Sequence, residues 1–162
     1  MNPYGITLDK IIPLSLARLE ADATVVDEVD GELFPFFEEE ARAELQLIER
    51  ALLGWDEAPA PLKDLVRQFH TLKGAANSIG HIRIGALAGG MKDLLEQIDP
   101  AHTAALRHQM IKTNIQVIQT IRALLQEVRS PKFNPVKKEQ IVLTVQAIMC
   151  LWTMAGNLQK AA

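Results

Sequence analysis

The chain has 162 residues, of which 48% are hydrophobic and 23% are charged, with a formal net charge of −3. This length fits one domain, or one domain with helical extensions. The longest apolar stretch, residues 141–154, is shorter than the roughly 20 residues needed to cross a bilayer, so no membrane span is expected. A single cysteine, Cys150, excludes an intrachain disulfide and favours a cytoplasmic location. Because its neighbours are apolar, we expect Cys150 to be buried.

The charges are distributed unevenly along the chain. Residues 1–60 carry 4 basic and 14 acidic side chains, whereas residues 61–162 carry 13 basic and 6 acidic ones. Such asymmetry can indicate an acidic partner for the second part. No basic cluster interleaved with aromatic residues occurs there, which argues against a nucleic-acid partner.

Residues 1–31 are predicted to be an N-terminal helical extension followed by a linker. Apolar residues recur at helical spacing from Thr7 to about Glu20, and Pro13 interrupts this helix. The acidic segment from Asp22 to Gly31 is interpreted as the linker.

Residues 32–130 carry four apolar helical patterns with short connections between them. Pro35 suits a first helical turn, and the glutamates at positions 38–40 are expected to be solvated there, near the positive end of the helix dipole. The short connections predict an up-down antiparallel four-helix bundle, so the fold class is all-α. The four expected helices run from about 34 to 54, 62 to 79, 84 to 98 and 101 to 129.

Residues 131–162 predict one further apolar helix, packed on the bundle or on a partner. Asn134 is expected to cap this helix, with Pro135 in its first turn. The helix has two apolar stripes, which suggests burial between layers, against the first helix or a second subunit in a homodimer. One stripe contains Ile141, Val145, Ile148, Trp152 and Ala155, and the other contains Leu143, Ala147, Leu151, Met154 and Leu158.

His70 is the residue whose setting indicates chemistry. Helical spacing places it on the side of its helix away from the apolar stripe, together with Lys73, Gly74 and Asn77. An imidazole near its ordinary pKa is largely unprotonated at neutral pH and can accept a phosphoryl group. The Lys73 ammonium would pair with the added negative charge, and Gly74 would leave room for another protein. The alternative is an ordinary surface histidine, with the glycines serving close packing.

The stretch at residues 69–80, Phe-His-Thr-Leu-Lys-Gly-Ala-Ala-Asn-Ser-Ile-Gly, resembles the HxxKGxxxxxG signature of histidine-containing phosphotransfer (HPt) domains. The resemblance extends to residues 36–41 and 86–96 and covers roughly residues 32–125. It is strongest to the N-terminal phosphotransfer domain of chemotaxis-type histidine kinases.

The resemblance implies that His70 is phosphorylated, that Lys73 stabilises the phosphate and that Gly80 marks the helix end. It also implies that Gly74 gives a receiver domain room to dock, with Asn77 on the same face. Gly89 and Lys92 of the following helix are expected to take part in the same docking surface. The expected partners are a response-regulator receiver domain, a hybrid histidine kinase, or both. No cofactor is expected on this chain, and Mg²⁺ is expected on the receiver. The chain would be a phosphocarrier and not an enzyme, since it has no nucleotide-binding motif or room for a kinase domain.

One departure from the resembled kinases concerns the next helix, which in them carries a histidine and, three residues on, a glutamate that orient the phospho-acceptor. The corresponding positions here are Gly89 and Lys92. Lys92 would raise the positive potential near His70 and remove a group that activates the imidazole toward ATP. This favours phosphoryl relay from a receiver aspartate over direct phosphorylation by an attached kinase core.

Two alternatives remain open: a helical interaction module with a vestigial phosphotransfer face, or a phosphotransfer domain excised from a larger chemotaxis-type kinase. The other histidines, His81, His102 and His108, match no metal-ligand spacing and are expected to be solvated.

Overall fold

The computed structural model describes residues 14–21, 27–56 and 60–161, and the regular elements in these ranges are all helical. The all-α prediction is confirmed. The elements are α1 (Leu14–Ala21), α2 (Phe34–Leu53), α3 (Leu62–Ser78), α4 (Ile82–Gln97), the 3₁₀ helix η1 (Pro100–His102), α5 (Thr103–Arg129) and α6 (Lys138–Ala161). The expected helix start at Thr7, the interruption at Pro13 and part of the expected linker lie outside the described residues.

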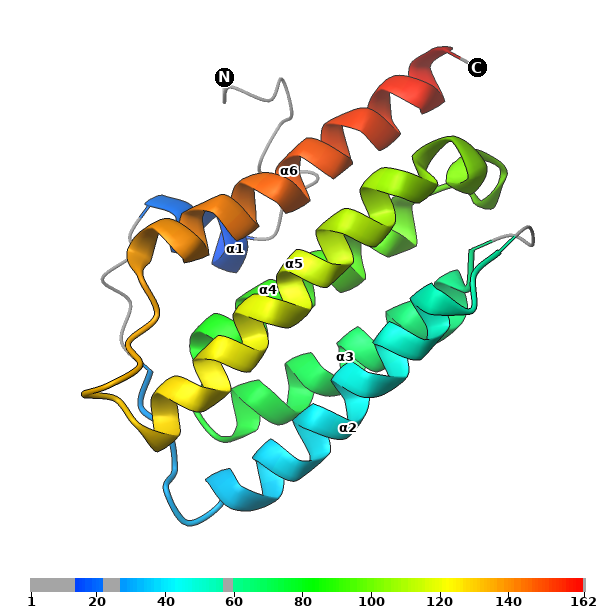
Figure 1. Ribbon diagram of the computed structural model, residues 1–162. Helices are drawn as coiled ribbons and strands as arrows, with labels where there is room; N and C mark the ends of the chain where they lie inside the picture. Colours follow the sequence, from blue (N-terminus) through cyan, green and yellow to red (C-terminus); the bar gives the residue numbers. More distant parts are fainter. Residues whose placement is uncertain (1–13, 22–26, 57–59, 162) are drawn as a thin grey trace.

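Helices α2 to α5 form an up-down antiparallel bundle (Figure 1). Each helix contributes an apolar stripe at the spacing that the sequence predicts, and α3 packs chiefly against α4 and α2. The core includes Leu45 and Ile48 of α2, Leu65, Phe69 and Leu72 of α3, Leu87, Met91 and Leu94 of α4, and Ile118 and Ile121 of α5.

Helices α1 and α6 add a second layer to this bundle. α6 runs beside α5, and α1 contacts both α6 and α4 (Figure 1). Leu16 of α1 is fully buried, and a Cβ at Gly90 of α4 would lie 2.6 Å from Leu16 Cδ2. α1 can therefore approach α4 closely because position 90 has no side chain.

The start of α6 differs from the sequence prediction. Asn134 and Pro135 precede the helix, which begins at Lys138. The Ser130 carbonyl accepts the backbone N–H of Asn134 at 2.9 Å, and the Val136 N–H donates to Glu127 at 2.6 Å. These bonds hold the connection in a turn at the end of α5, so the capping roles predicted for Asn134 and Pro135 are wrong.

The two apolar stripes of α6 are buried to different extents. The stripe beginning at Ile141 is buried along its length, whereas Leu143 of the other stripe is 58% exposed. By length and composition α6 could cross a membrane, but a core helix of a soluble protein satisfies the same criteria. Its packing on α1, α4 and α5 accounts for the apolar residues of the first stripe.

Cys150 and Glu38 lie in surroundings opposite to those predicted. Cys150 is exposed, because it faces away from the buried positions 148 and 152 of the same helix. Glu38 is only 5% exposed and accepts bonds of 2.6 and 2.8 Å from the Arg129 guanidinium, which ties the start of α2 to the end of α5. The hydrogen bond from Arg129 lowers the pKa of Glu38 despite its burial.

Candidate functional site

The side chain of His70 is exposed at the middle of α3. Its neighbours Phe69 and Leu72 are buried in the core. With these two side chains facing inward, the helical rotation between residues directs the imidazole toward solvent. The ring can therefore be reached by a group on another molecule.

Lys73, one turn further along α3, lies across α4. The lysine is half-buried, and a Cβ placed at Gly89 would stand 3.2 Å from Lys73 Cδ and 3.4 Å from Cε. The aliphatic stem thus fits against α4 because position 89 has no side chain. Among the described residues, no ion pair involves the Lys73 ammonium. Its charge is available for an anion bound at His70.

The two remaining predicted residues of this face, Gly74 and Asn77, have different surroundings. A Cβ at Gly74 would meet nothing within 4 Å, so internal packing does not require glycine there. Asn77 is exposed, and a Cβ at Gly85 of α4 would come within 1.9 Å of its Oδ1. The Asn77 side chain therefore packs against α4, whereas at Gly74 the backbone near His70 is not covered by a side chain.

A surface groove of about 590 Å³ begins at His70 and runs between the first half of α3 and the second half of α4. In addition to His70, the groove is lined by four charged side chains, Lys63, Arg67, Lys92 and Glu96. Its apolar lining is Leu62, Val66, Leu95, Ile98 and Pro100. A groove lined by both apolar and charged side chains is compatible with a surface that binds another protein.

The structure brings Lys92 to the same groove as His70, but its charge is shared with two carboxylates. Lys92 Nζ lies 3.2 Å from Glu96 Oε1 and 3.4 Å from Asp93 Oδ1. The hydrogen bond to Glu96 raises the pKa of Lys92. The sequence prediction treats Lys92 as a second cation near His70 and does not weigh Glu96, although the i,i+4 spacing of the two residues favours this pair.

Gly80 ends α3, as predicted, through a backbone conformation that favours glycine. Its φ is +84°, and a Cβ there would lie 2.1 Å from the carbonyl oxygen of Glu28. Beside it, the Asp30 N–H donates to the Ile79 carbonyl at 2.9 Å. The segment before α2 is therefore packed directly against the end of the helix that carries His70.

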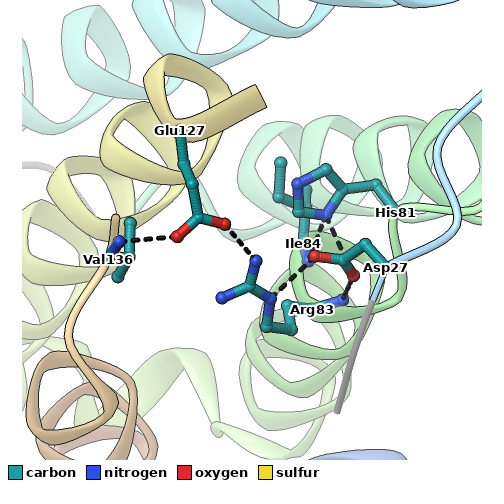
Figure 2. A network of polar contacts seen from close by, with 6 residues as sticks. All are labelled: Asp27, His81, Arg83, Ile84, Glu127 and Val136. Carbon is teal, nitrogen blue, oxygen red and sulfur yellow. Dashed lines mark hydrogen bonds and ion pairs between the residues drawn. The ribbon is translucent and has the colours of Figure 1, made fainter. Parts of the chain in front are cut away.

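A network of polar side chains lies just beyond this turn (Figure 2). Arg83 of α4 donates to Asp27 at 2.7 Å and also pairs with Glu127 of α5. Glu127 in turn accepts the Val136 N–H. The network joins the segment before α2, the start of α4, the end of α5 and the connection to α6, so it fixes the second layer to the bundle.

His81 belongs to this network, and the expectation that it is solvated is wrong. Its side chain is fully buried, and its Nδ1 accepts the Ile84 N–H at 3.3 Å as the N-cap of α4. Asp27 Oδ1 lies 3.5 Å from the same nitrogen. Histidine is not among the residues favoured at an N-cap, so the sequence contains no specific signal for this role.

We expect this histidine to make the folded protein sensitive to acid. Burial lowers the pKa of His81, an effect that the nearby Asp27 and Glu127 oppose and that Arg83 adds to. The unfolded chain therefore takes up a proton below about pH 6.5 that the folded chain does not, and stability falls by at most about 1.4 kcal/mol per pH unit. Chemical denaturation should show the wild type losing up to about 1.6 kcal/mol between pH 6.5 and 5 relative to H81N, because the unfolded histidine is only half protonated at the upper end of this range.

Asparagine at position 81 retains a cap acceptor but does not titrate. The matched control is H108N, which removes an exposed histidine of α5 and should follow the wild-type curve. Parallel pH–stability curves for wild type and H81N would contradict the assignment.

The remaining histidines offer no second site. His102 is half-buried and His108 is exposed, and no group of three or more potential metal ligands occurs in the described part of the chain.

The family model described as Hpt domain matches residues 32–131. This range includes α2 to α5 and therefore His70, Lys73, Gly74 and Asn77 of α3. No curated protein matches the chain, and no solved structure does.

Proposed function

The chain belongs to the Hpt domain family, and on that basis we propose that His70 accepts a phosphoryl group and exchanges it with an aspartate of a receiver domain. The observation that carries this proposal is the exposed imidazole on α3 beside an ammonium without an ion-pair partner among the described residues, that of Lys73. The bare backbone at Gly74 supports it, because a partner's phosphorylated side chain has to approach closely.

For the transfer step this chain has to supply only a nucleophilic nitrogen and a cation. The unprotonated ring nitrogen of His70 attacks phosphorus, the bond from phosphorus to the aspartate oxygen breaks, and the carboxylate leaves with the electron pair. The other ring nitrogen keeps its proton. Lys73 then pairs with the phosphoryl oxygens by charge-assisted hydrogen bonds, and the Mg²⁺ that neutralises the transferring group belongs to the receiver.

Relay from a receiver fits the site better than direct phosphorylation by a kinase core. No carboxylate occupies position 92, where it could orient and activate the ring, and Lys92 stands there instead. The partners are therefore a response-regulator receiver and the receiver of a hybrid histidine kinase, acting in the cytoplasm.

The test is phosphoryl transfer from phosphorylated receivers of the source organism. Mixing each with this chain should give an acid-labile, base-stable label with at least one receiver, and mass spectrometry should place it on His70. The absence of label with every receiver would overturn the proposal and favour an interaction module with an inactive phosphotransfer face.

A further inference from the structure

Lys73, one turn from His70 on α3, and Lys92, which lines the same groove as His70, differ in their ion-pair partners. Lys73 lies on Gly89 with no ion-pair partner among the described residues, whereas Lys92 is paired with Glu96 and Asp93. Both Lys92 and Glu96 line the groove that His70 borders. A phosphoryl group on His70 would therefore appear beside a lysine that already has a counter-charge.

We propose that Lys92 exchanges Glu96 for the phosphoryl group when His70 is phosphorylated, so that Glu96 sets how strongly the groove retains that group. This inference rests on the proposed phosphorylation of His70. Glu96 is a positioning residue in it, because it acts through Lys92 and does not take part in the transfer.

Because the Lys92–Glu96 ion pair is open to solvent, breaking it costs little free energy. The side chains of Lys92 and Glu96 are 21% and 42% exposed, and ion pairs this open to water contribute little to stability. A phosphoryl group carries close to two negative charges against one on a carboxylate, so it competes well for the ammonium. The ion pair can therefore break without disturbing the fold.

After the exchange, Glu96 remains in the groove as a carboxylate with a weakened partner. Its charge opposes the phosphoryl dianion and favours its departure, while Lys73 continues to hold it. The other charged residues lining the groove are Lys63 and Arg67, and Arg67 pairs with Asp64 at 3.2 Å. The phosphoryl group would therefore meet two cations: Lys73, which does not line the groove, and Lys92, which lines it and whose charge Glu96 partly neutralises.

The experiment needs no partner protein. Phosphoramidate can load His70 directly, because the ring nitrogen attacks phosphorus and ammonia leaves as the phosphorus–nitrogen bond of the reagent breaks. Phosphorus NMR as a function of pH then gives the second pKa of the phosphohistidine, which a nearby cation lowers and a nearby carboxylate raises. A merely structural role of Glu96 would not move this value.

We expect E96Q to lower the phosphohistidine pKa by about 0.2–0.7, equivalent to about 1.5- to 5-fold tighter retention of the dianion. K92Q should raise it, and E96D, which keeps the carboxylate, should resemble the wild type. The matched control is E49Q, which removes the same charge from a partly exposed ion pair with Arg122 between α2 and α5 and should leave the pKa unchanged.

The outcomes separate the two proposals. A phosphohistidine signal with the same pKa in wild type, E96Q and K92Q would overturn the exchange and leave the function of His70 standing. A shift in E49Q as large as that in E96Q would reduce the effect to net charge and also overturn it. If phosphoramidate places no label on His70, the proposed function fails and the exchange fails with it.

Discussion

Replacing His70 by glutamine is expected to abolish phosphoryl acceptance while changing the free energy of unfolding by no more than about 0.5 kcal/mol. The imidazole is exposed and makes no hydrogen bond or ion pair with any of the described residues. Its removal therefore hardly changes the stability of the fold. Glutamine is similar in size and favourable in a helix, but its amide nitrogen is not a nucleophile. Transfer from a phosphorylated receiver and denaturation of the same preparation measure the two effects.

His108 provides the matched control for this variant. It is also exposed on a bundle helix, but it lies on α5, away from Lys73 and from the groove. H108Q should be labelled as the wild type is. Label that survives in H70Q, or that disappears in H108Q, would show that the acceptor has been assigned to the wrong histidine.

The four-helix bundle could be predicted from the sequence because the spacing of apolar residues along each helix is a local pattern. The stripe of Leu65, Phe69, Leu72 and Ala76 repeats at helical spacing, and it places His70 on the opposite side without any knowledge of the neighbouring helices. Gly80 likewise follows the last apolar position of α3, where a helix-ending glycine is common.

Features that depend on distant partners could not be predicted in this way. Glu38 meets Arg129 across 91 positions, and nothing in the first turn of α2 indicates that its carboxylate is covered. The ion pair of Lys92 with Glu96 is local, but helical spacing alone does not show that both line a groove at His70. Which side of α6 is buried depends on how α1 and α5 pack against it, and this left Cys150 misassigned.

The largest loss of stability is expected from Gly80→Ala, which should lower the free energy of unfolding by about 2–4 kcal/mol. A left-handed conformation costs a non-glycine residue about 1–2 kcal/mol, and Gly80 has a φ of +84°. The added Cβ would also stand 2.1 Å from the Glu28 carbonyl oxygen. This contact is with backbone, so relief requires the segment before α2 to move from the end of α3. Denaturant unfolding followed by circular dichroism measures the difference.

Gly74→Ala is the control, because it makes the same change inside α3, where neither a positive φ nor a backbone clash applies. Its Cβ would meet nothing within 4 Å, and alanine in an exposed helix is favoured over glycine by about 0.5–1 kcal/mol, so stability should rise. Opposite signs for these two substitutions would separate the conformational requirement at position 80 from the general effect of adding a methyl group. If G80A were as stable as the wild type, the left-handed turn and the contact with Glu28 could not be what holds the end of α3 in place.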